Sequence, residues 1–317
     1  MSRPSFALFS ARSILRAIRH TQPANIFIPS PLRSAQNRVT MVTTAHVNVD
    51  TRKADGPFPL VETPAYNQND SNPSPDHFVK VASHMALAHN VIIRGLNSIY
   101  KQAEFVRVED YPGFVAYAYC WYEFLQAHHD LEEESLFPAL ERLTGEKGLM
   151  DSNVAEHRLF HTALAAYAEY LGPLRDTPHD FSASIVIKLI DALAPPLLSH
   201  LSSEIPTLLG LSCHPHFAKP SSEADLASAA DSLVSLYAAE EKSITMRLSF
   251  TEGQMFFFFN LDREYEGGRW KDWPPVPNSV IWLTLRTWGQ WRRSWWTFAA
   301  CGMDGRLRVL EALKDKP

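Results

Sequence analysis

Residues 76–211 carry four long runs of apolar residues at helical spacing, and no alternating strand pattern competes with them. The first run shows the period most clearly, through Val81, Met85, Ala88, Ile92, Leu96 and Ile99. Turn sequences rich in Pro and Gly separate the runs. Four long helices with short connections predict an all-α fold, an up-down-up-down four-helix bundle.

Proline and glycine set the expected helix ends. The first helix is expected to start at Ser74-Pro75-Asp76 and to end before the break at Tyr111-Pro112-Gly113. The second should span about 114–143, the third about 151–171 up to Gly172-Pro173, and the fourth about 181–211. Pro195-Pro196 lie inside the fourth helix, where we expect a kink or a break because proline removes a backbone donor.

The N-terminal segment differs in composition from the rest of the chain. Residues 1–49 contain six Arg and no Asp or Glu, with apolar residues between Ser and Arg. This pattern is typical of a mitochondrial transit peptide. The alternative is a disordered leader on a cytoplasmic protein. Residues 1–49 are set aside from the fold prediction in either case.

Three further segments complete the expected organisation. Residues 50–75 are rich in Pro and form a linker or strap, residues 76–211 form the bundle, and residues 212–317 form a C-terminal extension. A helix is expected at about 221–243, and seven of the eight Trp lie in 270–296. Such aromatic surface should be buried against the outside of the bundle, or against a second subunit in a homodimer.

Composition narrows the classes of function. The formal net charge is −5, so no global basic field favours nucleic acid. The three Cys lie far apart and give neither a disulfide framework nor a cysteine zinc site. No apolar run free of charge is long enough for a membrane span. The Trp- and Arg-rich tail is therefore interpreted as packing surface rather than a base-stacking surface.

Metal-ligand side chains recur at one spacing along the expected helices. Positions i and i+4 share one helix face, so two side chains at that spacing can bind one metal. Such pairs are His128 with Glu132, His129 with Glu133, His157 with His161, and His200 with Glu204, while the first helix carries His89 alone. The pairs stand among apolar residues, where an uncompensated charge would cost several kcal/mol. Together they indicate metal ligands.

The ligand count favours two ions rather than one. The candidate ligands are His89, His128, Glu132, His157, His161, His200 and Glu204, five imidazoles and two carboxylates. The donors suit two first-row metals that share an oxygen bridge and leave one coordination position open. Imidazole with carboxylate favours Fe, and Mn or Zn could use the same donors.

The order and spacing of these ligands resemble the hemerythrin family of His-His-Glu cation-binding domains. The matching pieces are His89-Asn90, the run from His128 to Glu133 followed by Leu136-Phe137-Pro138, Glu156-His157 with His161, and His200-Leu201 with Glu204-Ile205. The tail, with Asp262 to Gly268 and Trp273-Pro274-Pro275, is similar to fungal members. The resemblance implies that His157, His161 and His200 hold one iron, His89 and His128 hold the other, and Glu132 and Glu204 bridge them.

The register of the second helix stays open between His128/Glu132 and His129/Glu133. Leu131 favours the first pair, because a residue at i+3 also faces inward. A ferritin-like oxidase needs Glu-x-x-His, and a zinc protease needs His-Glu-x-x-His; neither motif is present.

Three functions remain for a site of this kind. The first is a diiron protein that binds O2, or a related molecule such as NO or peroxide. The second is an iron-homeostasis sensor or store, and the third is a diiron oxidase or peroxide-handling enzyme. Binding is favoured over catalysis, because no sequence feature supplies a substrate pocket or a reductase partner.

Overall fold

The computed structural model describes residues 50–66, 77–218, 231–239 and 252–316, which belong to one compact unit that spans residues 48–317. Within these ranges the regular structure is helical, apart from an isolated antiparallel bridge between Cys301 and Leu307. The leader at 1–49 and the helix start at Ser74-Pro75-Asp76 lie outside the described residues. Of the helix expected at 221–243, residues 231–239 are described and are helical.

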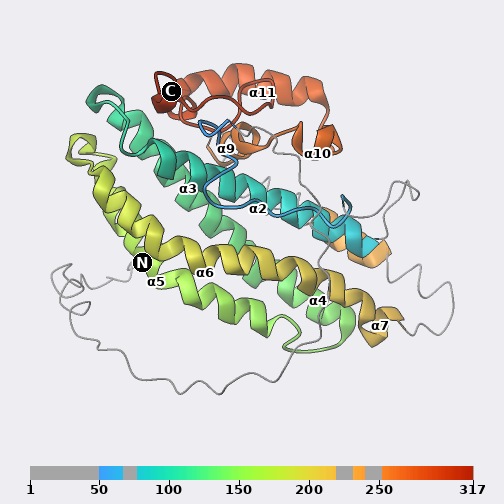
Figure 1. The fold of residues 1–317 in the computed structure, drawn as a ribbon. Helices are drawn as coiled ribbons and strands as arrows, with labels where there is room; N and C mark the ends of the chain where they lie inside the picture. Colours follow the sequence, from blue (N-terminus) through green and yellow to red (C-terminus); the bar gives the residue numbers. More distant parts are fainter. Residues whose placement is uncertain (1–49, 67–76, 219–230, 240–251, 317) are drawn as a thin grey trace, which may run out of the picture. The chain divides into compact units, whose positions relative to one another are not determined.

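The bundle follows the order predicted from the sequence. Its helices are α2 (His77–Gln102), α3 (Tyr111–Leu131) continued by the π-turn η2 (Glu132–Leu136) and α4 (Phe137–Thr144), α5 (Asp151–Leu174), and α6 (Ala183–Gly210). Helices α5 and α6 pack on each other, α6 packs on α2, and α3 packs on both α2 and α5. The prediction of an all-α bundle is confirmed (Figure 1).

Three proline sites differ from the expectation. Tyr111 begins α3 instead of breaking a helix, because Pro112 occupies the first turn, where a missing N–H costs nothing. Helix α5 includes Pro173 and ends one residue later, at Leu174. Of the kink or break expected at Pro195-Pro196, the break is wrong, because α6 is continuous there. The carbonyls that lose their donors belong to Asp191 and Ala192, both exposed, so water can satisfy them.

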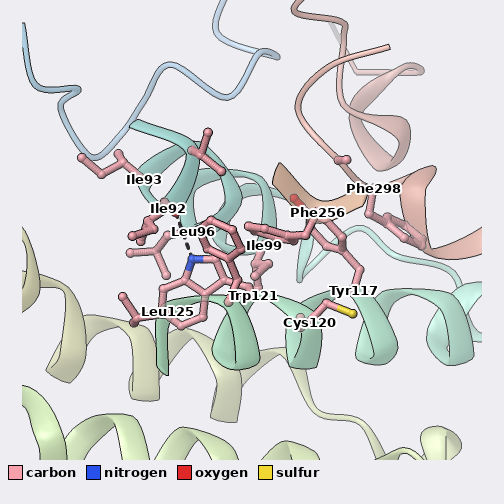
Figure 2. Close-up of a cluster of buried hydrophobic side chains, with 14 of the residues drawn as sticks. Ile92, Ile93, Leu96, Ile99, Tyr117, Cys120, Trp121, Leu125, Phe256 and Phe298 are labelled. Carbon is pink, nitrogen blue, oxygen red and sulfur yellow. Dashed lines mark hydrogen bonds between the residues drawn. The ribbon is translucent and has the colours of Figure 1, made fainter. Parts of the chain in front are cut away.

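Part of the main hydrophobic core lies between α2, α3 and the C-terminal extension. Figure 2 shows Trp121 among Ile92, Leu96, Leu125 and Phe256, with its Nε1 donating a hydrogen bond to the Ile92 carbonyl at 2.9 Å. A Cβ on Gly95 would lie 2.5 Å from the Phe256 ring, so only glycine permits this close packing.

Residues 50–66, expected as a linker or strap, lie along the outer side of α2. The Asn97 side chain accepts a hydrogen bond from the Phe58 amide and donates to the carbonyls of Phe58 and Ala54. Asn90 likewise accepts a hydrogen bond from the Val61 amide and donates one to the Val61 carbonyl. Both asparagines are fully buried. Because these polar residues follow helical spacing, they fasten an irregular segment to one face of α2.

The C-terminal extension covers the α2 and α3 side of the bundle. It contains α9 (Gly253–Asn260), α10 (Tyr265–Gly268), α11 (Asn278–Trp291) and α12 (Arg293–Trp296). Helix α9 packs on α2 and α3, α12 packs on α3, and α11 lies outside α9 (Figure 1). Trp273 and Trp296 are buried as expected. Trp282, Trp288 and Trp291 are exposed, so the bundle does not bury them.

One described helix, with the turn that follows it (Ala183–Cys213), has the length and apolar composition of a membrane span. It includes α6, which packs along α5 and α2 and carries the buried His200 and Glu204. Its apolar character is therefore that of a core helix of the bundle.

Candidate metal centre

The bundle interior contains a cluster of polar side chains contributed by α2, α3, η2, α5 and α6. The members share near-complete burial, each being at most 5% exposed: His89, His128, His129, Glu132, His157, His200 and Glu204. Five imidazoles and two carboxylates are thus enclosed among apolar side chains, where each must find a partner.

Helices α2 and α6 meet at His89 and Glu204. The Nε2 atom of His89 lies 3.2 Å from Oε2 of Glu204, and both side chains are fully buried. The other ring nitrogen, Nδ1, lies 2.7 Å from the carbonyl oxygen of Leu201 and can donate to it. This bond fixes the tautomer, so that the lone pair of Nε2 points into the cluster.

The π-turn η2 determines which side chains of the continuous segment α3–η2–α4 face inward. A π-turn adds a residue to one helical turn, which shifts the faces before and after it. His128, His129 and Glu132 are all buried, whereas the Glu133 side chain is 44% exposed. The Oε1 atom of Glu132 lies 3.0 Å from Nε2 of His128. The inner pair is therefore His128 and Glu132, and Glu133 lies outside the cluster.

Helices α5 and α6 contribute a pair of facing histidines. Nε2 of His157 lies 3.0 Å from Nε2 of His200. The outer nitrogens, Nδ1, each face a carboxylate, with His157 2.7 Å from Glu133 and His200 3.2 Å from Glu156. Glu156 also accepts a 2.6 Å hydrogen bond from Ser203. Metal-binding histidines commonly bind a carboxylate or carbonyl through the second nitrogen in this way.

Several inner atoms of the cluster have no hydrogen-bond partner. They are Nε2 of His89, His128 and His129, and both carboxylate oxygens of Glu132 and Glu204. Leaving that many buried polar atoms unsatisfied would be very costly, since each costs about 1–3 kcal/mol. A bound cation removes that cost, so the residues present fit a metal.

The spacing between these atoms also suits coordination. Nitrogen ligands lie about 2.0–2.1 Å from a first-row metal, so two neighbouring ligands at right angles lie about 3 Å apart. Contacts in that range join His157 to His200 at 3.0 Å, and Glu132 to His128 at 3.0 Å and to His157 at 3.4 Å.

The candidate ligand atoms form two groups that share one carboxylate. His89, His128 and Glu132 make one group, and His129, Glu132, His157 and His200 make the other, each with its atoms within 4.8 Å of one another. Glu132 faces the first group through Oε1 and the second through Oε2. Glu204 lies 3.2 Å from His89 and 4.0 Å from His200, so it also contacts both groups.

Burial controls the protonation of the histidines. It lowers the pKa of His128 and of His129 far below the ordinary value, with neighbouring histidines adding to the effect. Burial likewise lowers the pKa of His200 to about 3. These rings are therefore neutral near pH 7, the form in which imidazole binds metal.

The two carboxylates respond differently to their surroundings. Burial, with the charge of Glu204 nearby, raises the pKa of Glu132 to about 7. Burial would also raise the pKa of Glu204, but the nearby histidines, His89 foremost, outweigh it and lower that pKa. A cation would favour the ionised form of both side chains.

One expected ligand lies elsewhere and one unexpected histidine is present. The structure does not bring His161 to the cluster; its side chain is exposed on α5. The buried stripe of α5 includes Asn153, His157, Phe160 and Leu164. That stripe passes through position 160, so position 161 turns outward. The expected pairing of His157 with His161 thus gives way to proximity between His157 and His129, whose ring centroids lie 4.4 Å apart.

The sequence did not predict His129 as an inner residue, because its pair with Glu133 was an alternative to the pair of His128 with Glu132. The available signal was Leu125, a fully buried residue four positions earlier on α3. A helix presents i and i+4 on one face, so His129 continues the stripe of Leu125. The π-turn then lets Glu132 share that interior, which spacing alone does not show.

Comparison with known proteins places this cluster in a family context. Residues 81–211 match the family model described as Hemerythrin HHE cation binding domain. The chain is also similar to the dimeric xanthone biosynthesis cluster protein R11 of Cryptosporiopsis sp. (strain 8999), at 31% identity over 257 residues. That match covers 80% of this chain and 90% of the relative. No solved structure matches the chain.

Proposed function

The chain belongs to the hemerythrin HHE cation-binding family, and from that premise we propose that it is a non-haem diiron protein that binds O2 or a related small molecule. The proposed ligands are His89, His128, His129, Glu132, His157, His200 and Glu204. His129 takes the place that the sequence suggested for His161. The observation that carries the proposal is the set of inner nitrogens and oxygens without partners.

Two ions are favoured over one by the placement of the carboxylates. Glu132 presents its two oxygens to two different histidines, His128 and His157. Glu204 lies between His89 and His200, one from each group. A carboxylate so placed can bridge two cations.

Iron is favoured by the donor types. The cluster offers imidazole nitrogens and carboxylate oxygens, a mixture that suits iron, manganese or zinc. When bound, an iron pair would supply redox chemistry and an open position for O2, NO or peroxide. The chain itself orients the imidazoles, with the Nδ1 atoms of His89, His157 and His200 facing acceptors.

A small neutral ligand suits the surroundings better than a polar substrate does. Phe160 lies with its ring centroid 5.0 Å from that of His129, and Phe137 lies 5.9 Å from His157. These rings are buried and offer no hydrogen bonds. The lining supports binding of O2 over conversion of a larger substrate.

Metal analysis with optical spectroscopy tests the proposal. We expect about two iron ions per chain and visible absorption that bleaches with dithionite and returns with O2 through repeated cycles. His200→Ala should lose iron, whereas His161→Ala, which alters an exposed histidine on the same bundle, should keep it. Absence of metal in the protein as purified and after loading with Fe(II) would overturn the diiron proposal. Iron that oxidises once without returning would instead indicate a sensor or an enzyme.

The biosynthetic name of the relative favours one alternative, a diiron oxidase or peroxide-handling enzyme. The relative is described as a protein of a dimeric xanthone biosynthesis cluster. If this chain is an enzyme, the iron-loaded protein should consume peroxide or O2 catalytically, with many turnovers per iron, and His200→Ala should abolish turnover. Stoichiometric uptake alone would exclude this alternative.

We also propose that residues 1–49 direct the protein to mitochondria. The support is the composition, with six Arg and no acidic residue. A fusion of residues 1–49 to a fluorescent reporter should co-localise with a mitochondrial dye. A diffuse cytoplasmic signal would favour the alternative location.

A further inference from the structure

Helix α11 carries apolar residues on its buried side and also on sides that the protein leaves exposed. Ile281, Leu285 and Gly289 are buried at spacings of four residues and face α9. A Cβ on Gly289 would lie 3.2 Å from the Phe259 ring, which shows how closely the two helices approach. This stripe accounts for the docking of α11 on the rest of the extension.

The opposite side of α11 also carries large apolar residues, and they are exposed. Val280, Leu283 and Trp291 are 50%, 56% and 62% exposed. Their spacing places them on one side of the helix, away from the buried stripe. Trp282 and Trp288, 56% and 44% exposed, lie at the two edges of this side, next to the buried stripe. These five residues are called the outer face of α11.

A helix with apolar residues all round is normally buried on all sides. The outer face of α11 departs from that rule, because five large apolar side chains share one short helix and remain in contact with water. Contiguous exposed apolar surface of this kind marks an interaction site.

Charge around the outer face identifies the kind of partner. Residues 273–303 contain no Asp or Glu and three Arg, although the whole chain has a net charge of −5. The guanidinium of Arg286 lies 5.1 Å from the ring centroid of Trp282, and that of Arg292 lies 4.9 Å from the ring of Trp291. Glu252 contacts Arg292 at 3.6 Å and offsets part of this charge. Exposed indoles next to arginines suit a partner that has an anionic surface and an apolar layer beneath that surface.

A second copy of the chain fits this surface poorly. In a two-fold dimer the same face meets itself, so the arginine-bearing face would meet a second face of the same charge. Like charges across an interface are unfavourable. An anionic lipid surface presents phosphate and carboxylate groups to the arginines and an apolar layer to the tryptophans.

From this arrangement we propose that the outer face of α11 is a peripheral membrane-binding surface for anionic lipid. The helix lies in the plane of the interface, with Leu283 and Trp291 inserted below the headgroups and Arg286 at their level. The proposal concerns attachment to one leaflet and is independent of the metal centre.

Vesicle binding by the full chain tests this proposal. Vesicles of phosphatidylcholine alone are compared with vesicles that also contain phosphatidylserine, both with brominated acyl chains. Bromine quenches tryptophan that reaches the acyl layer. The readout is specific, because residues 1–49 contain no Trp, so their arginines cannot cause quenching. We expect quenching and co-sedimentation with the mixed vesicles and much weaker binding to phosphatidylcholine alone.

Matched variants localise the contact. The double variant Leu283→Ser with Trp291→Ser should bind at least about tenfold more weakly, because both apolar anchors are lost. Leu159→Ser is its control, since Leu159 is 71% exposed on α5. Arg286→Gln should bind about fivefold more weakly. Arg158→Gln, which changes an exposed arginine of α5, is the control for charge.

The outcomes separate the proposal from its alternatives. Reduced binding in the α11 variants, with the α5 controls unchanged, supports it. Equal binding to both vesicle types, absence of quenching, or equal loss in Leu159→Ser overturns it. A concentration-dependent dimer that dissociates in the double variant, without lipid binding, overturns it in favour of a second copy. Arg286→Gln leaves the apolar residues in place, so it remains informative if the double variant misfolds.

Discussion

Nε2 of His157 and Nε2 of His200 face each other at 3.0 Å across the contact between α5 and α6. Two imidazole nitrogens at this distance must share a proton or a cation, because two lone pairs repel each other. Burial lowers the pKa of His200 to about 3. Burial also acts to lower the pKa of His157, but the nearby carboxylate of Glu132 outweighs it and raises that pKa. Without metal the proton therefore resides on His157.

Metal removal should destabilise the protein through this cluster. A ligand at about a hundred times its dissociation constant stabilises a fold by about 2.7 kcal/mol. Chelation followed by thermal unfolding should lower the melting temperature of the native chain by several degrees. In His200→Ala the chelator should change the melting temperature little, because the site is already incomplete. An equal shift in both proteins would contradict a metal held by His200.

Substitutions of His129 and of His161 should have opposite effects on iron content. His129 is buried and its ring contacts those of His157 and His200, whereas His161 is exposed. We expect His129→Ala to lose at least one iron per chain and His161→Ala to retain the full content, measured by elemental analysis after gel filtration. Iron loss in His161→Ala with retention in His129→Ala would restore the pairing suggested by the sequence.

The pKa of Glu132 predicts a pH dependence for the metal-free protein. Burial, together with the charge of Glu204, raises this pKa from 4.5 to about 7. As pH rises between these values, the unfolded chain releases a proton that the folded protein retains. The Glu132 contribution to stability therefore declines across this window.

Glu132→Gln removes that contribution. Relative to the native chain, the free energy of unfolding of metal-free Glu132→Gln should rise between about pH 5 and about pH 8, by up to about 3 kcal/mol. Urea unfolding after chelation measures the difference. Glu132 also raises the pKa of His157, and the loss of that effect in the variant changes the difference in the same direction. A difference that is constant with pH would contradict the raised pKa.

The helical periodicity was sufficient to predict the bundle, because each stripe of apolar residues specifies one buried face. The periodicity was less reliable at prolines. The effect of Pro195 depends on whether the carbonyl of Asp191, which has lost its backbone donor, can reach water. Asp191 is exposed, so the helix continues, and that exposure is a tertiary property.

The ligand types were readable from spacing, but the rotation of each helix was not. Residues four positions apart lie about 40° apart around the axis, so at the edge of a buried stripe His157 can face inward while His161 faces out. The π-turn at Glu132–Leu136 adds a local change of register that i, i+4 counting does not predict. The exposure of Trp291 depends in the same way on which stripe of α11 meets α9.

The strap at residues 50–66 should depend on Asn97. Its side chain makes hydrogen bonds to the backbone of Phe58 and Ala54. Asn97→Ala leaves these groups without their partner and should cost about 2–4 kcal/mol of stability. Hydrogen exchange in the strap should accelerate while iron content stays unchanged, because Asn97 contacts no proposed ligand.

Gln126→Ala provides the control for that variant. Gln126 also makes a side-chain hydrogen bond, to Asp130, but at an exposed position. Its removal should change stability by less than about 0.5 kcal/mol. Unchanged exchange in Asn97→Ala would show that the strap is held by other contacts.

Gly95 determines how closely α2 approaches the extension. An added Cβ would lie 2.5 Å from the Phe256 ring and 2.8 Å from the Trp121 ring, both of which are fully buried (Figure 2). Gly95→Ala should therefore destabilise the fold by about 1–3 kcal/mol, although alanine favours helix. Gly210→Ala, at the end of α6 with no heavy atom within 4 Å of the added Cβ, should be neutral or stabilising. Denaturant unfolding of the two variants measures the contrast. Equal stability would mean that α9 can shift away from α2 without cost, and the buried contact of Phe256 would then contribute little to holding the extension on the bundle.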